Sequence, residues 1–365
     1  MGSFAVDSLS YFCHYETPKI VVINSWKISL INRITQMCII SYIIGHNPPL
    51  KNLTFYLRYF SYVLVYNKGY QHIYQVDNVA VITKVKGVSV TNYSVDDFQV
   101  KRNNDYYNRI WDSVEYVIPP SENGAFFIMT NAIITPNQTQ SICDETPDIP
   151  AALCNDSCPV GETFRNGNGI TTGKCIISTQ KPEVKVCQVA AWCPVEINKL
   201  PLKNNKVLIS GAENYTVLIK NSIQFASLRG KYGRNNILEN SNSSYMQSCY
   251  YNEKTDPLCP VFQVGDMIKA AGENFSEVAS IGAVMAVTIT WNCDLDKDFM
   301  KHCIPKYSFR RLYEHSLIHP GWNFRFSYTH EFERRTVLKA YGIKFVIEVQ
   351  GEAGQFQLLP TFQNI

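Results

Sequence analysis

Ten of the twelve cysteines in this chain lie between Cys143 and Cys303, and this clustering constrains the fold more than any other feature. An even set of closely spaced cysteines is typical of disulfide bonds formed in an oxidising compartment. Six of the ten fall between Cys143 and Cys193, which predicts a small disulfide-held subdomain there. Ten cysteines permit on the order of 945 pairings, so spacing alone leaves the connectivity open. The ten are Cys143, Cys154, Cys158, Cys175, Cys187, Cys193, Cys249, Cys259, Cys293 and Cys303.

Potential N-glycosylation acceptors indicate the same compartment. A single N-x-S/T sequon is commonly accidental, but this chain has seven, and none precedes the apolar region near the N-terminus. Six of the sequons and ten cysteines lie beyond that region, and the seventh sequon, at Asn52, lies within it, which predicts that most of the chain is extracellular. The acceptors are Asn52, Asn92, Asn137, Asn155, Asn214, Asn242 and Asn274.

The apolar region over residues 28–66 resembles a membrane span that has been interrupted. Its first piece must end near Pro48 and Pro49, because proline lacks the backbone donor that a helix needs. Its second piece is shorter than the about 20 residues of a spanning helix. Removing residues 46–61 joins the two pieces, so we predict one transmembrane helix over residues 28–66 that carries an insertion at 46–61.

The residues before this span predict its orientation. Residues 1–27 lack the basic start, apolar run and small-residue cleavage site of a secretory signal peptide, so the span itself would direct export. Lys19, Lys27 and Arg33 lie at its N-terminal side, which favours a cytoplasmic N-terminus. We therefore predict that residues 1–27 are cytoplasmic and that residues 67–355 form an extracellular domain.

Short apolar runs separated by turn-rich segments predict that this extracellular domain is mainly β. No sequence typical of a nucleophilic or metal-dependent enzyme occurs, and the net charge of +3 does not indicate a nucleic-acid partner. The stretch GNGITTGKC lacks the Ser or Thr that a phosphate-binding loop requires after its lysine, and CNDSC lacks the second ligand pair of a zinc site. The predicted strands are VAVITKVKGVSV, GAFFIMTNAII, YTVLIKNSIQF, VMAVTITWNC, FRFSYT and RTVLKAYGIKFVIEVQG.

Basic residues recur in these predicted strands at spacings that place them on one face. Lys84 and Lys86 are two residues apart, as are Asn323 and Arg325, and residues two apart in a strand project to the same side. Two interpretations stay open: a solvated outer face, or a site where several cations converge on the phosphates of an anionic ligand. Further candidates in similar contexts are Lys339, Lys220 and Thr216.

Ordered short stretches carry a resemblance that covers nearly the whole chain, from Tyr15 to Ile365. They are YETPK, NKGYQ, VITKVKGV, YVIPP, MTNAIITPNQTQ, GNGITTGKC, AAWCPVE, AENYTVLIKN, CPVF, WNCDLD, PKYSFRRL, GWNFRF and LKAYGIKF. Together they closely resemble the ionotropic purinergic receptors, the ATP-gated trimeric cation channels, and most of all the fourth-type purinoceptor subgroup.

The resemblance implies a mainly β ectodomain, with a β-sandwich body and a disulfide-rich head at residues 143–193, on transmembrane α-helices. It implies that residues 356–365 are the truncated start of a second span, which lines the pore in the family. It also implies the disulfide pairs Cys143–Cys193, Cys154–Cys175, Cys158–Cys187, Cys249–Cys259 and Cys293–Cys303.

The resemblance assigns the polar and cationic candidates to an ATP site between two subunits. One subunit supplies cations for the triphosphate and a threonine beside an apolar residue for adenine, namely Lys84, Lys86, Thr216 and Leu218. The neighbouring subunit supplies Asn323, Arg325 and Lys339. Lys220 is a peripheral candidate.

The expected function is therefore that of a plasma-membrane subunit of a non-selective cation channel that extracellular ATP opens, and not that of an enzyme. The resemblance implies a homotrimer or heterotrimer with related subunits in the lipid bilayer, with sodium, potassium and calcium as permeant ions. ATP is the activating ligand, and no cofactor, metal or nucleic acid is expected. The alternatives are a non-conducting or dominant-negative truncated subunit that binds ATP, and a disulfide-rich adhesion domain. An ectonucleotidase fits least, because no acid–base or metal constellation occurs.

Two insertions depart from the family pattern. The first is the interruption at residues 46–61. The second adds roughly ten residues around Asp97 to Asn108, and we predict a surface loop in which extra length costs little.

Overall fold

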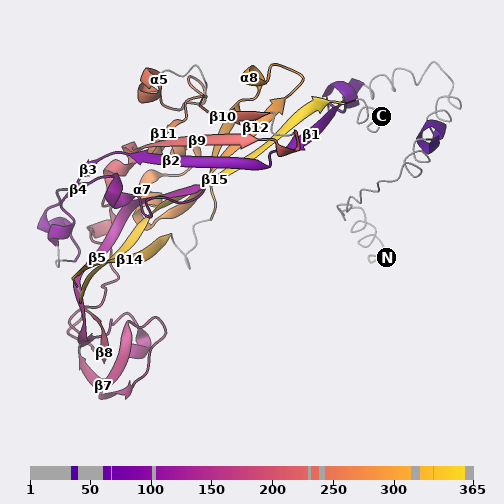
Figure 1. Ribbon diagram of the computed structural model, residues 1–365. Helices are drawn as coiled ribbons and strands as arrows, with labels where there is room; N and C mark the ends of the chain where they lie inside the picture. Colours follow the sequence, from indigo (N-terminus) through magenta and orange to yellow (C-terminus); the bar gives the residue numbers. More distant parts are fainter. Residues whose placement is uncertain are drawn as a thin grey trace, which may run out of the picture. The chain divides into compact units, whose positions relative to one another are not determined.

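The long strand β15 organises a nine-stranded sheet (Figure 1). It pairs in parallel with β12 and antiparallel with β5, and also pairs with β1 and β14. The sheet continues from β5 through β8 and β7 to β6, and from β12 to β13. Its strands are β1 (Gln71–Gln75), β5 (Ala125–Asp144), β6 (Ser157–Val160), β7 (Gly169–Ile177), β8 (Lys185–Cys193), β12 (Ala283–Asp294), β13 (Pro305–Arg311), β14 (Asn323–Glu331) and β15 (Arg334–Phe356).

The structure is a computed structural model, and it describes most of the chain. The described residues are 34–39, 61–66, 68–100, 104–228, 232–237, 243–313, 321–331 and 333–357. The sheet lies in a compact unit of residues 71–357, and a second unit comprises residues 1–70 with 358–365.

A four-stranded sheet and a two-stranded ribbon complete the β structure of the larger unit. In the four-stranded sheet, β9 lies between β10 and β11 and also pairs with β2. The ribbon joins β3 to β4. These strands are β2 (Asn78–Lys86), β3 (Ser89–Val90), β4 (Ile110–Trp111), β9 (Thr216–Gln224), β10 (Gly233–Asn235) and β11 (Val261–Gln263).

Short helices cover the sheets, and α7 packs against β15 and β5. The α-helices are α4 (Ser113–Tyr116), α5 (Ser243–Ser248), α6 (Val264–Ala270), α7 (Phe275–Ile281) and α8 (Phe299–His302). The remaining turns are the π-helix η1 (Tyr62–Tyr66) and the 3-10 helices η2 (Val95–Asp97), η3 (Asn104–Tyr106), η4 (Pro150–Ala152), η5 (Lys203–Asn205), η6 (Ser210–Asn214) and η7 (Ala226–Leu228).

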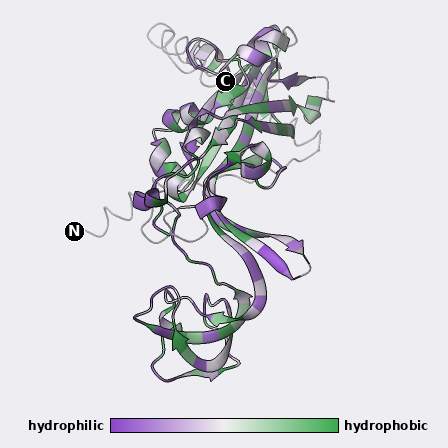
Figure 2. Ribbon diagram, turned by 90° about the vertical axis from the view of Figure 1, so that its left-hand side faces the viewer, coloured by the Kyte–Doolittle hydropathy of each residue, from purple (hydrophilic) through white to green (hydrophobic). Residues whose placement is uncertain are grey.

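The two sheets share one hydrophobic core. Burial alternates along β9 and β13, so that one face of each strand is more buried than the other, whereas β5 and β12 are buried on both faces over most of their length. Figure 2 shows the hydropathy of the residues along these strands. Polar groups also link the sheets inside the core. The indole of Trp291 on β12 donates to Asn221 on β9 at 2.7 Å, and the amide of Asn236 donates to the hydroxyl of Tyr307 on β13 at 3.0 Å. These bonds satisfy buried polar atoms and fix how the sheets stack.

The head at residues 143–193 extends from the far end of β5. The last six residues of β5 leave the body and pair with β8 (Figure 1). Three disulfides lie within the head, and two more lie in the body. The five pairs are Cys143–Cys193, Cys154–Cys175, Cys158–Cys187, Cys249–Cys259 and Cys293–Cys303, the pairs that the resemblance implied.

The loop between β3 and β4, predicted as a surface loop, has exposed residues such as Val95 but is also attached to the core by two aromatic residues. Phe98 and Tyr107, from the predicted second insertion, are only 2% and 5% exposed. Their rings lie 5.8 Å apart and belong to the main hydrophobic core. Because these two aromatic residues gain burial, the extra length is held against the body instead of extending into solvent.

The predicted first span falls mostly outside the described residues. In the smaller unit, residues 34–39 are helical and are followed, after a gap, by η1. Across the described parts of the chain, every helix is too short or too polar to traverse a bilayer. The predicted segments 1–27 and 46–60 also lie outside the described residues.

Candidate functional site

Strands β2 and β9 carry the first group of predicted ligand residues on one face. Lys84 lies directly opposite Leu218, and Lys86 directly opposite Thr216. Directly opposed residues of an antiparallel pair project to the same side, so the four side chains form one patch. The hydroxyl of Thr216 donates to the carbonyl of Lys86 at 3.4 Å. Lys220 lies two residues further along the same face of β9, and all three lysines are exposed.

Alternation along the two strands explains why this face is polar. On β9, Val217, Ile219 and Ile223 are at most 1% exposed, and Val85 on β2 is also buried. A one-residue change of register would bury the lysines and expose these apolar residues, so the hydrophobic pattern fixes the patch on the outside.

Gly87 fixes the end of β2 directly after Lys86. Its φ is +155°, and a Cβ built there would lie 2.1 Å from the ring of Tyr215. That ring stacks on Tyr116 at 4.3 Å between centroids, and the hydroxyl of Tyr116 donates to the carbonyl of Gly87 at 2.9 Å. Only glycine fits this approach, and the packing holds the adjacent Lys86 in place.

Strands β14 and β15 carry the second group. Arg325 lies directly opposite Lys339, and Asn323 directly opposite Tyr341, so these four side chains also share a face. Lys339 is only 6% exposed, and its ammonium lies 5.1 Å from the centroid of the Tyr341 ring. Arg325 is more open to solvent. The second group therefore combines a buried cation with an accessible one.

Glu196 supplies the counter-charge of the second group, and the sequence analysis missed it. Arg325 donates from Nη2 to Oε1 of Glu196 at 2.8 Å and from Nε to Oε2 at 3.0 Å. The ammonium of Lys339 lies 4.0 Å from the same carboxylate and donates a hydrogen bond to Asn198. Glu196 ends the stretch AAWCPVE, but no local pattern shows which cation it meets.

The electrostatics of this group follow from burial and from that one carboxylate. The hydrogen bonds from Arg325 to Glu196 raise the pKa of the guanidinium. Burial lowers the pKa of Lys339, and the charge of Arg325 lowers it further, while Glu196 opposes both effects. Burial also raises the pKa of Tyr341 to about 12, so this phenol stays neutral. Two cations held against one carboxylate leave a net positive site for an anion.

The second group borders a cavity of about 650 Å³ between the body and the head. Ligand sites in proteins commonly have volumes of roughly 300–1,000 Å³. Arg335, another residue that the sequence analysis missed, stacks its guanidinium 4.2 Å above the ring of Trp192 and donates to Gln138 at 2.9 Å. Both Arg325 and Arg335 line this cavity, which makes it suited to a phosphate-bearing ligand.

The two groups stay apart within one chain. The first lies on the four-stranded sheet and the second on the nine-stranded sheet (Figure 1). Among the described residues, no hydrogen bond or ion pair joins Lys84 or Lys86 to Arg325 or Lys339. A single chain thus presents two cationic groups on different sheets, each a candidate half-site.

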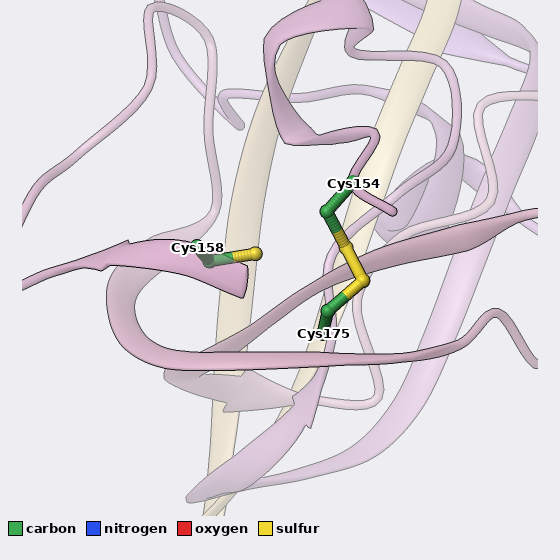
Figure 3. Close-up of side chains that lie close together, drawn as sticks. All are labelled: Cys154, Cys158 and Cys175. Carbon is green, nitrogen blue, oxygen red and sulfur yellow. A yellow bond between two sulfur atoms is a disulfide. The ribbon is translucent and has the colours of Figure 1, made fainter. Parts of the chain in front are cut away.

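Three sulfurs of the head lie close enough together to suggest a metal site (Figure 3). The Sγ atoms of Cys154, Cys158 and Cys175 lie within 4.8 Å of one another. Each belongs to a disulfide, however, and a metal requires the thiolate. The cluster is part of the disulfide framework, in agreement with the interpretation of CNDSC as disulfide-bonded.

Five of the seven predicted glycosylation acceptors lie on described residues, and all five are exposed. They are Asn92, Asn137, Asn155, Asn214 and Asn274. Asn52 and Asn242 lie outside the described residues. Exposure is required for glycosylation but does not establish it, so all seven remain predictions.

Comparison with known proteins identifies the family to which this chain belongs. Residues 13–365 match the family described as ATP P2X receptor. This chain belongs to the P2X receptor family. It is 41% identical over 367 residues to P2X purinoceptor 4 of Mus musculus, which covers 98% of this chain and 85% of that protein. It is 36% identical over 360 residues to P2X purinoceptor 5 of Homo sapiens, which covers 96% and 73%.

Solved P2X structures share the fold. A P2X receptor from the Gulf Coast tick, crystallised in the presence of ATP and Zn²⁺, has a TM-score of 0.78 and 42% identity, over 91% of this chain and 94% of that one. The chicken ATP-gated P2X7 receptor channel, with the competitive antagonist TNP-ATP, has a TM-score of 0.71 and 36% identity, over 90% and 92%. The mainly β, disulfide-bonded architecture of this P2X chain is thus that of the family.

Proposed function

We propose that this P2X chain is a subunit of a plasma-membrane cation channel that extracellular ATP opens, and that ATP binds between two subunits. The observation that carries the proposal is the separation of the two cationic half-sites within one chain. In a closed ring of three identical subunits, each interface joins one surface of a chain to a different surface of its neighbour. Such an interface can bring the β2–β9 patch of one subunit against the β14–β15 group of the next.

Each half-site has a distinct proposed role. From one subunit, Lys84 and Lys86 neutralise the triphosphate, and Thr216 and Leu218 contact adenine with a hydroxyl and an apolar side chain. Lys220 lies at the edge of this patch and contributes less. From the neighbouring subunit come Asn323, Arg325 and Lys339. Charge-assisted hydrogen bonds to phosphate are among the strongest that side chains form, so a polyanion gains most when both half-sites close on it.

The Glu196–Arg325 ion pair makes this closure dependent on the ligand. The carboxylate of Glu196 pairs with Arg325 from within the same chain. A phosphate that binds Arg325 must displace Glu196. The loss of that ion pair is offset by binding free energy, because the phosphates then contact the cations of both subunits. ATP shifts the channel toward the open state only to the extent that it binds more tightly when the two half-sites are drawn together around it. This difference in affinity arises at the interface between subunits.

The proposed membrane arrangement follows the sequence prediction. Residues 1–27 are cytoplasmic, residues 28–66 form the first span with its insertion at 46–61, residues 67–355 are extracellular, and residues 356–365 begin the second span. The paired cysteines and the five exposed sequons lie within residues 71–357, which supports an extracellular position for this unit.

Whole-cell recording from cells that express this chain tests the function. ATP should evoke an inward current carried by sodium and calcium, and buffer alone should not. Absence of both current and labelled-ATP binding at the cell surface would contradict the proposal. Binding of ATP without current would contradict the proposed channel activity but would still support the proposed nucleotide site.

A further inference from the structure

The loop between β3 and β4 is fastened to the protein on two sides. Its described parts, residues 91–100 and 104–109, contain the buried rings of Phe98 and Tyr107. The hydroxyl of Thr91 donates to the carbonyl of Tyr107 at 2.5 Å, which anchors the returning half of the loop. Because close-packed protein interiors transmit strain, a shift of this loop should also shift the residues that it contacts.

One side of the loop holds the segment that follows β8. Phe98 forms an isolated antiparallel bridge with Leu202. The backbone N–H of Gln99 donates to the carbonyl of Pro201 at 2.9 Å, and its side-chain amide donates to the carbonyl of Leu200. These contacts fix residues 200–202, a few positions after the Glu196 and Asn198 that hold the second half-site.

The other side of the loop touches the strand behind Lys339. The backbone N–H of Ile134 on β5 donates to the hydroxyl of Tyr107 at 3.0 Å. Its neighbour Ile133 is the direct partner of Lys339 in the β5–β15 pairing. Burial raises the pKa of Tyr107 to about 12, and the negative charge of Glu196 adds to this rise, which places the phenol within the field of that carboxylate.

A small cavity lies between the loop, β5 and the segment that follows β8. It measures about 30 Å³, close to the volume of one water molecule in the liquid. Val100 and Tyr107 of the loop line it together with Ile133, Val195 and Ile197. Val195 and Ile197 flank Glu196 in the chain, so the loop and the segment that carries this carboxylate line the same cavity.

We infer that residues 95–100 and 104–108 of this loop form a brace that holds Glu196 against Arg325, so that Gln99 and Tyr107 are positioning residues for the nucleotide site. Neither residue is proposed to touch ATP. The inference rests on the proposed function and adds a regulator to it: a firmly held Glu196 competes better with phosphate for Arg325. Removing the contacts of Gln99 or Tyr107 should therefore weaken the competition of Glu196 with phosphate and lower the ATP concentration needed for a response.

A double-mutant cycle with Glu196 tests the brace. Gln99→Ala removes the amide bond to Leu200 from an exposed position and leaves the core intact. Tyr107→Phe keeps the buried ring and removes only the hydroxyl. Each should lower the half-maximal ATP concentration about two- to fivefold in the otherwise unchanged protein. Neither should lower it further in a Glu196→Gln background, because the competing charge is already gone.

The control is Val95→Ala, in the same loop at a side chain that is 63% exposed, and it should leave the response unchanged. Equal shifts in the two backgrounds would overturn the inference, because the loop would then act through something other than Glu196. Unchanged responses in both test variants would overturn it as well. If the unaltered chain neither binds nor responds to ATP, the proposed function itself has failed, and this outcome is visible before any variant is compared.

Discussion

Arg325 and Glu196 form a two-bond ion pair, at 2.8 and 3.0 Å, on the wall of a cavity of about 650 Å³. The arginine belongs to β14, and the glutamate lies just past the end of β8. An internal carboxylate thus occupies the guanidinium that the proposed function gives to phosphate. On the proposed function, ATP would exchange one anionic partner of Arg325 for another, so its net gain in binding free energy there would be smaller than a free arginine would give.

Neutralising Glu196 should make the channel more sensitive to ATP. Glu196→Gln removes the competing charge and keeps the shape of the side chain. We expect the half-maximal ATP concentration for current to fall about three- to tenfold, a modest effect because the Arg325 side chain is 54% exposed and solvent weakens the pair. A matched control is Glu348→Gln, which breaks a similar two-bond pair with Arg310 on another part of the sheet. A rise in the half-maximal concentration for Glu196→Gln would show that the carboxylate aids ATP binding.

Removing Lys84 should reduce ATP sensitivity far more than removing a lysine elsewhere. Lys84→Ala deletes a charge-assisted contact to the triphosphate, and we expect the half-maximal ATP concentration to rise about 10- to 100-fold. Lys220→Ala, at the edge of the patch, should raise it about twofold. Lys306→Ala, at an exposed position on β13, serves as the control and should have no effect. Concentration–response curves for the three variants check this order, and equal effects would refute the assignment of Lys84.

Alkaline pH should weaken the response through Lys339. Burial and the nearby Arg325 lower the pKa of this ammonium, so it loses its proton at a lower pH than an ordinary lysine does. Lys339 is fully charged well below that pKa and becomes neutral as the pH rises through it. ATP sensitivity should therefore fall as the pH becomes more alkaline. Concentration–response curves from about pH 7.5 to about pH 9.5 measure this, with Lys339→Arg as the comparison because guanidinium stays charged throughout. An identical pH dependence in the two proteins would exclude Lys339 as the titrating group.

The sequence predicted which face of β2 and β9 carries Lys84 and Lys86, because the relevant information is local. Alternation of apolar and polar residues fixed the exposed face of β2 and β9, and Lys84 and Lys86 lie on it as their spacing required. The disulfide pairs came only from the family resemblance, since ten cysteines leave the connectivity open.

Other features depend on contacts between residues far apart in the chain. Glu196 meets Arg325 across 129 positions, and no periodicity signals such a pair. The second insertion was predicted as a surface loop, and several of its described residues, such as Val95 and Tyr106, are exposed. The sequence did not reveal that Phe98 and Tyr107 attach this loop to the core, where two aromatic side chains gain free energy from burial.

Co-expression of two half-site variants tests the central claim most directly. Lys84→Ala damages only the β2–β9 patch, and Lys339→Ala damages only the β14–β15 group. If ATP binds between subunits, each variant alone should respond only to greatly raised ATP. Cells that express both should recover part of the response at low ATP, because some interfaces then join two intact half-sites. If both half-sites served one site within a single chain, every site would carry a defect, and co-expression would restore nothing.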